Sequence, residues 1–165
     1  KVSFKEDTSE NLLKHLDQAQ IDFAIFAFPY ELPDYIESYQ VFADPIYFIQ
    51  HKNRKSKEID NGSLLMLEQG HCLRSHILQN NEISSNHISN FSCTSISTLV
   101  AMVDTNIGVS FLPRMAIDFG VLSHYPNINI DLKSTKAKRD IGVIYRKNNP
   151  QEESIIKLAT LLKTS

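Results

Sequence analysis

The sequence predicts an α/β fold with largely parallel sheets, built as one domain or as two small lobes. The chain has 165 residues, of which 42% are hydrophobic and 22% are charged, so it carries enough apolar side chain to form a core. Segments with apolar residues at helical spacing alternate with short runs that are almost wholly apolar. That order is typical of repeated strand and helix units.

The first part of the chain predicts a helix followed by three strands. Residues 10–18 have leucines at helical spacing and follow two candidate N-cap residues, Thr8 and Ser9. The next run is nearly continuous in apolar residues, which predicts a strand buried on both faces. In order, the strands are expected at 21–28, 40–42 and, after Pro45, at 46–50.

The rest of the chain continues the alternation. The expected elements are a strand at 63–68, a helix from Cys72, a strand at 87–92, a helix at 94–104, strands at 109–112 and 141–146, and a helix at 154–162. The helix at 94–104 has four apolar residues on one face: Ile96, Leu99, Val100 and Val103. Four residues of the last helix are expected to face the core: Ile155, Leu158, Ala159 and Leu162.

Composition excludes several classes of protein. The net charge is −2, and the basic runs at 52–57 and 133–139 are interpreted as solvated loops, so this chain alone is not expected to bind DNA. The longest apolar run, 23–28, is too short to span a membrane. Two cysteines provide no disulfide framework, which indicates a reducing compartment such as the cytoplasm. No phosphate-binding loop or metal-ligand motif is found, so no cofactor and no metal are predicted.

Ligands of α/β proteins bind beyond the carboxyl ends of strands, which directs attention to the turns at 6–9, 70–74 and 92–95. In the second of these turns, a thiol at the start of a helix meets the positive end of the helix dipole, and two basic neighbours favour the thiolate further. The residues are Gly70, His71, Cys72, Leu73 and Arg74. A thiolate here would attack peroxides, disulfides or electrophiles. On the residues alone, the role of a small buried apolar residue is favoured for Cys72, as it is for most lone cysteines, and the reactive thiol is the alternative.

The other two turns carry hydroxyl groups. Cys93 is interpreted as a small residue packed where a helix meets a sheet, and it is followed by Thr94 and Ser95. These hydroxyls, like those of Thr8 and Ser9, can cap a helix or bind a small polar ligand, and one residue can do both.

Several segments resemble the effector domains of LysR-type regulators. The resemblance rests on residues 6–25, on 94–113 and on the run from Arg139 to Arg146, and it covers nearly the whole chain. It implies a periplasmic-binding-protein-like (type 2) fold, with two Rossmann-like lobes joined by two crossover strands. The lobes would be 1–44 with 140–165, and 45–139. The first strand and helix of lobe one, and the winged helix-turn-helix domain, would lie outside this chain.

Residues 64–74 resemble the peroxide-sensing OxyR branch of that family more specifically. The resemblance implies that Cys72 is the peroxide-reactive cysteine and that His71, Arg74, Ser9 and Arg139 belong to its site. The chain departs from the branch at two positions. Asn81 stands where a second, resolving cysteine is expected, and Ser75 replaces an aspartate. Three products of oxidation at Cys72 therefore stay open: a sulfenic acid, a mixed disulfide with a small thiol, or a disulfide with Cys93.

Together these features predict the regulatory domain of a cytoplasmic LysR-family DNA-binding regulator that senses hydrogen peroxide through Cys72. It would act as a homodimer or homotetramer, and it would bind DNA through a domain not present in this chain. The alternative is a regulator that binds a small organic effector between its lobes, near Thr8, Ser9, Gly70, Thr94 and Ser95, with Cys72 not redox-active. An enzyme is not expected, because no convincing base and orienting pair accompanies the thiol.

Overall fold

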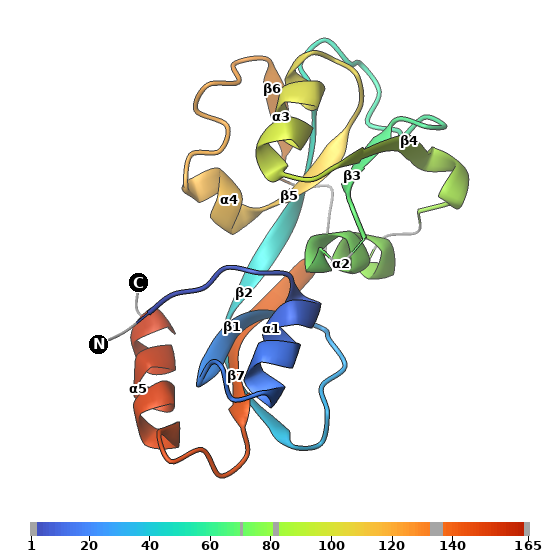
Figure 1. The fold of residues 1–165 in the computed structure, drawn as a ribbon. Helices are drawn as coiled ribbons and strands as arrows, with labels where there is room; N and C mark the ends of the chain where they lie inside the picture. Colours follow the sequence, from blue (N-terminus) through green and yellow to red (C-terminus); the bar gives the residue numbers. More distant parts are fainter. Residues whose placement is uncertain (1–2, 70, 81–82, 133–136, 164–165) are drawn as a thin grey trace. The chain divides into compact units, whose positions relative to one another are not determined.

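Helices are interspersed among the strands along the chain, and the first three strands follow one another without a helix between them (Figure 1). The computed structural model describes residues 3–69, 71–80, 83–132 and 137–163. The chain divides into two compact units, which are considered separately below. The first unit is 1–43 with 139–165, and the second unit is 44–138.

The first unit is a small sheet covered by a helix on each face. Strand β1 (Phe23–Phe28) pairs antiparallel with β7 (Lys138–Arg146), and β7 neighbours the long strand β2 (Ile36–His51). Helix α1 (Ser9–Asp17) packs with Ile144, whereas α5 (Glu152–Lys163) packs with Val143 and Tyr145. Because successive strand residues point to opposite faces, the two helices cover opposite faces of β7.

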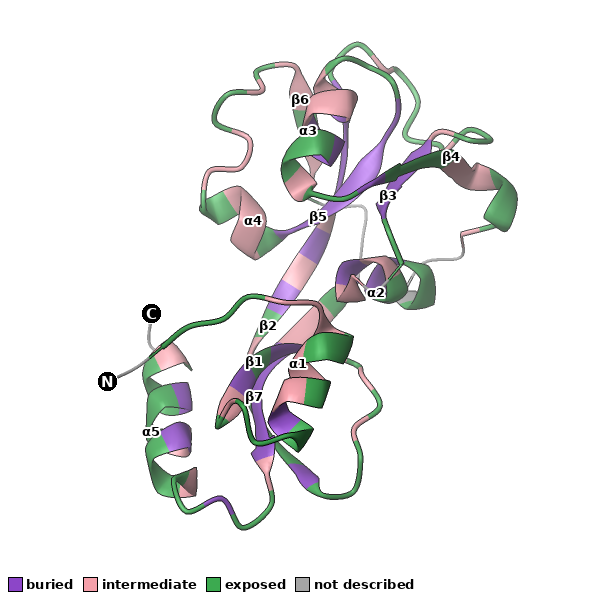
Figure 2. Ribbon diagram, in the orientation of Figure 1, coloured by how far each residue is buried: buried purple, intermediate pink, exposed green. Residues whose placement is uncertain are grey.

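The second unit contains the larger core. Its elements are β3 (Leu64–Leu67), α2 (Cys72–Asn80), a short 3-10 turn (Ser85–His87), β4 (Ile88–Cys93), α3 (Ile96–Asp104), β5 (Ser110–Pro113), α4 (Arg114–Asp118) and β6 (Ile128–Asp131). All four residues of β3 and of β5 are buried, as Figure 2 shows. Val109 links the two strands, because its N–H donates to the Ser63 carbonyl at 2.9 Å and its carbonyl accepts from Leu65 N–H at 2.8 Å.

Predicted capping residues are confirmed for α1 and α3, although α3 begins at Ile96 and not at Thr94. Thr8 is the N-cap of α1, and its Oγ1 accepts from the N–H of Asn11 at 3.4 Å. Ser95 is the N-cap of α3, and its Oγ accepts from the N–H of Thr98 at 3.2 Å. The predicted apolar face of α3 is buried at Leu99, Val100 and Val103, and Ile96 is partly buried at the margin of the core.

The expectation of largely parallel sheets is wrong. Among the described pairings, β3 with β4 is parallel, whereas β1 with β7, β2 with β5 and β2 with β6 are antiparallel. The partner of β1 comes from the far end of the chain. Alternation of helices and strands along a sequence does not specify which strands pair or in which direction.

Three other expectations need correction. The strands predicted at 40–42 and 46–50 are one continuous strand, β2, which runs through Pro45; proline is tolerated where a strand needs no N–H donor. Strand β1 is not covered on both faces, because Ile25 is 51% exposed. In α5, Ile155 and Ala159 are buried and Leu162 is partly buried, but Leu158 is 38% exposed.

An α-helix and a strand were not predicted. Helix α4 follows directly after Pro113, which supplies no capping side chain. Instead, Asp44 Oδ1 accepts from the Met115 N–H at 3.0 Å, across a separation of 71 residues. Strand β6 pairs with β2 between His51 and Phe48. No helix in the described part of the chain is long and apolar enough to cross a membrane.

Candidate functional site

Cys72 is the first residue of α2, and it is a free, partly exposed thiol. The turn before it is short and backbone-bonded. Glu68 N–H donates to the Cys93 carbonyl at 3.0 Å, and the Glu68 carbonyl accepts from His71 N–H at 3.4 Å. The end of β3 is thereby fixed against the end of β4, and the thiol is set at the N-terminus of α2. Gly70 lies outside the described residues.

Arg74 lies in the first turn of α2. Its Nη1 donates to the Leu67 carbonyl at 3.2 Å, so the guanidinium is bound to the last residue of β3. With Glu68, Gln69 and Ser92 it lines a hollow of about 390 Å³ in the second unit. Charged and polar groups thus surround the turn that presents Cys72.

Cys93 differs from Cys72 in its surroundings. Its side chain is 2% exposed, and its Sγ lies 3.6 Å from Met102 Sδ. Burial raises the pKa of the Cys93 thiol, and the nearby Glu68 carboxylate raises it further. The thiolate of Cys93 is therefore disfavoured at neutral pH, and the packing interpretation of this cysteine fits its position.

The hydroxyl of Ser95 caps α3. Ser95 Oγ accepts from Thr98 N–H and also lies 3.1 Å from Thr98 Oγ1. Thr94 is exposed and immediately precedes this cap. Ser95 is thus engaged in capping, and the predicted ligand-binding role of Thr94 and Ser95 stays a prediction.

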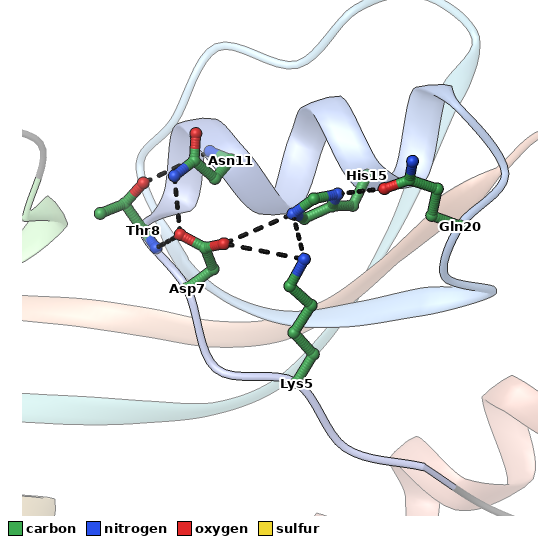
Figure 3. Close-up of polar contacts among 6 residues, drawn as sticks. All are labelled: Lys5, Asp7, Thr8, Asn11, His15 and Gln20. Atoms are coloured by element: carbon green, nitrogen blue, oxygen red, sulfur yellow. Dashed lines mark hydrogen bonds and ion pairs between the residues drawn. The ribbon is translucent and has the colours of Figure 1, made fainter.

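The start of α1 contains a polar network that sequence reasoning missed (Figure 3). Asp7 Oδ1 accepts from Thr8 N–H at 2.9 Å and from Asn11 Nδ2 at 2.7 Å. Asp7 Oδ2 lies 3.4 Å from His15 Nε2, and that nitrogen lies 2.6 Å from Lys5 Nζ. The Asn11 hydrogen bond, followed by the Thr8 amide, lowers the pKa of the Asp7 carboxyl. The spacing of Asp7 and Asn11, four residues apart at a helix start, was the available signal.

The predicted site residues fall in both units. His71, Cys72, Arg74, Cys93, Thr94 and Ser95 belong to the second unit, and the structure brings the first three together at one turn. Thr8 and Ser9 lie at the start of α1, and Arg139 lies in β7, all in the first unit. Ser9 and Arg139 are each partly buried. Within the described ranges, no three His, Cys, Asp or Glu side chains converge as a metal site requires.

Comparison with known proteins identifies the family. The family profile described as the LysR substrate binding domain matches residues 1–165. The chain belongs to this family. The regulatory domain of OxyR2 from Vibrio vulnificus in its reduced form has a TM-score of 0.89 and 31% identity, over 97% of this chain and 79% of that one. The predicted periplasmic-binding-protein-like α/β fold is therefore confirmed.

Sequence relatives extend the comparison. The regulator EstR of Acinetobacter baylyi is 26% identical over 166 residues, which is 96% of this chain and 55% of that protein. The regulator OxyR of Escherichia coli K12 is 28% identical over 172 residues, which is 96% of this chain and 54% of that protein. The chain spans about half the length of these relatives. LysR-type proteins are transcriptional regulators and not enzymes, as the sequence led us to expect.

Proposed function

We propose that this chain is the regulatory domain of a LysR-family regulator that senses hydrogen peroxide through oxidation of Cys72. The observation that carries the proposal is a free, partly exposed thiol at the N-terminus of α2, in a turn shared with His71 and Arg74. The likeness to the OxyR2 regulatory domain and to relatives named as peroxide-inducible activators supports it. Ser9 and Arg139 are proposed as further members of the site.

The chemistry is a two-electron oxidation of sulfur. The Cys72 thiolate attacks one oxygen of hydrogen peroxide, so an S–O bond forms as the O–O bond breaks. The second oxygen leaves as hydroxide and takes up a proton to become water. Cys72 is left as a sulfenic acid.

The fate of this sulfenic acid depends on whether another thiol of the chain can attack it. Asn81 supplies no thiol, and Cys93 is buried with a raised pKa, which disfavours it as an attacking thiolate. The sulfenic acid therefore persists, or it condenses with an external small thiol. In that condensation an S–S bond forms and water leaves, with no further oxidant required.

The whole regulator is proposed to reside in the cytoplasm, where thiols are kept reduced, and to act as a homodimer or homotetramer. It would bind DNA through a winged helix-turn-helix outside this chain. In this proposal the effector lobes are 1–44 with 140–165, and 45–139. Oxidation at Cys72 would change the conformation of the residues that follow it in the chain. That change would alter the arrangement of the subunits.

A second candidate is a regulator that binds a small organic effector. The relative EstR is similar over 96% of this chain and is not named for peroxide, which favours a family member whose ligand is something else. In that case Cys72 would not be redox-active, and the effector would bind near the helix starts that carry Thr8, Ser9, Thr94 and Ser95.

Trapping of the sulfenic acid separates the two candidates. The reduced chain, Cys72→Ser and Cys93→Ala would each receive equimolar hydrogen peroxide with dimedone, followed by intact-mass and peptide analysis. We expect one dimedone adduct per chain, on Cys72, in the unmodified chain and in Cys93→Ala, and none in Cys72→Ser. Absence of any adduct or mass change in the unmodified chain would overturn the peroxide proposal and favour the organic effector. Loss of two hydrogens that depends on Cys93 would overturn the single-thiol step.

A further inference from the structure

His15, in the last turn of α1, has a bonding partner at each of its two ring nitrogens. Its Nδ1 lies 2.5 Å from Gln20 Oε1, in the turn that follows the helix. Its Nε2 lies 2.6 Å from Lys5 Nζ and 3.4 Å from Asp7 Oδ2, both in the segment that precedes the helix (Figure 3). The imidazole therefore connects the segment before α1 with the turn after it.

The contact with Lys5 fixes the protonation state of this ring. The Lys5 ammonium has three N–H donors and no lone pair, so His15 Nε2 can bond to it only as an acceptor. The proton of a neutral ring with Nε2 as the acceptor lies on Nδ1, where Gln20 Oε1 is placed to accept it. The two contacts thus agree on one neutral tautomer, with the proton on Nδ1.

The Asp7 carboxylate offers the same nitrogen a second partner. The Asn11 hydrogen bond, followed by the Thr8 amide, lowers the pKa of the Asp7 carboxyl, so Asp7 is ionised throughout the pH range in which histidine changes its charge. When Nε2 gains a proton it becomes a donor, and it can donate to Asp7 Oδ2. It can no longer accept from Lys5, because two positively charged donors would then face each other at 2.6 Å.

We infer that Lys5, Asp7 and His15 form a pH-sensitive latch: the neutral imidazole holds Lys5, and the protonated imidazole releases Lys5 and bonds to Asp7. The latch closes as the pH rises through the range in which histidine loses its charge, and it opens as the pH falls. The segment that it holds leads directly into Thr8, which caps α1. Opening of the latch therefore loosens the chain that leads into this helix. The inference goes beyond the proposed function and does not depend on Cys72.

The groups of the latch are within reach of protons from the solvent. The side chains of His15 and Asp7 are 20% and 23% exposed, and that of Lys5 is 49% exposed. The imidazolium is therefore not formed in an apolar interior, where desolvation would oppose it. Other titratable groups lie on α1, on the segments beside it and on β7, and the variants that test the latch leave them unchanged. They are Glu6, Glu10, Lys14, Asp17, Asp22, Tyr30 and Arg146.

NMR of the imidazole nitrogens tests the closed state of the latch. The signals of the His15 ring are identified by their loss in His15→Gln. At pH 8.5 we expect the tautomer protonated on Nδ1 to exceed the other by about tenfold, as one hydrogen bond to a charged group would produce. In Lys5→Met, Nε2 is free to donate to Asp7, so the tautomer protonated on Nε2 should predominate. Lys14→Met, which removes a lysine paired with Glu10 on the same helix, is the matched control and should keep the parent tautomer.

The opening of the latch is followed at Lys5 in the same chains. Between pH 8.5 and pH 5.5, we expect the Nζ and amide signals of Lys5 to shift together with the ring signals of His15. This shift should be absent from His15→Gln. A parent ring protonated on Nε2 at pH 8.5, or a tautomer that Lys5→Met does not alter, would overturn the inference. Lys5 signals that respond to pH equally in the parent chain and in His15→Gln would overturn it as well.

Discussion

Replacing Gly108 with alanine is expected to destabilise the second unit by about 3 kcal/mol. A Cβ at this position would meet the Ser63 carbonyl oxygen and would lie 2.8 Å from Leu65 Cγ. Neither neighbour can move freely. The Ser63 carbonyl accepts from Val109 N–H, Leu65 N–H donates to the Val109 carbonyl, and the Leu65 side chain is 1% exposed. The contact therefore strains the link between β3 and β5.

Urea unfolding monitored by circular dichroism measures this effect. Asn106→Gly, in the same turn, is the matched control. Asn106 has φ +62°, a conformation that suits glycine, so this change should alter the free energy of unfolding by less than about 0.5 kcal/mol. A Gly108→Ala chain as stable as the parent would show that β3 is not fixed in the way described. Because β3 leads into the turn that presents Cys72, the same variant should also change the alkylation rate of that thiol.

Leu16→Ala is expected to destabilise the first unit by about 3 kcal/mol. Leu16 is 0% exposed and packs in a small cluster with Ala24, Phe26, Ile36 and Ile144. A cluster of this size has few other side chains that can shift to fill the space left behind. The cost should therefore include both the lost burial and a cavity.

Leu13→Ala serves as the comparison for this second prediction. Leu13 lies on the same helix but is only partly buried, so its truncation should cost about 1 kcal/mol. Both variants would be unfolded in urea and their free energies compared with that of the parent chain. Equal losses for the two leucines would contradict the assignment of Leu16 to the centre of this core.

Helices with local signals could be predicted from the sequence. Thr8 and Ser95 cap α1 and α3 because their hydroxyls reach N–H groups three residues ahead, which is an interaction visible in the sequence. Helix α4 lacks such a signal, because the side chain that binds its Met115 N–H is Asp44, from a distant strand. The antiparallel pairing of β1 with β7 likewise depends on contacts between the two ends of the chain.

The candidate site could likewise be predicted only where it depends on residues that are neighbours in the sequence. The turn with His71, Cys72 and Arg74 is contiguous in sequence, and the predicted helix start at Cys72 is confirmed. The burial of Cys93 beside Met102 depends on how the second unit packs.

The most direct test of the central claim is the rate at which peroxide oxidises Cys72. The second-order rate constant would be measured at pH 7 in the Cys93→Ala chain, by competition with free glutathione as the reference thiol. We predict a rate constant at least about 100-fold above that of glutathione, which corresponds to roughly 2.7 kcal/mol of additional transition-state stabilisation. A rate constant equal to that of glutathione would mean that the turn does nothing to activate the thiol, and it would contradict the assignment of Cys72 as a peroxide sensor.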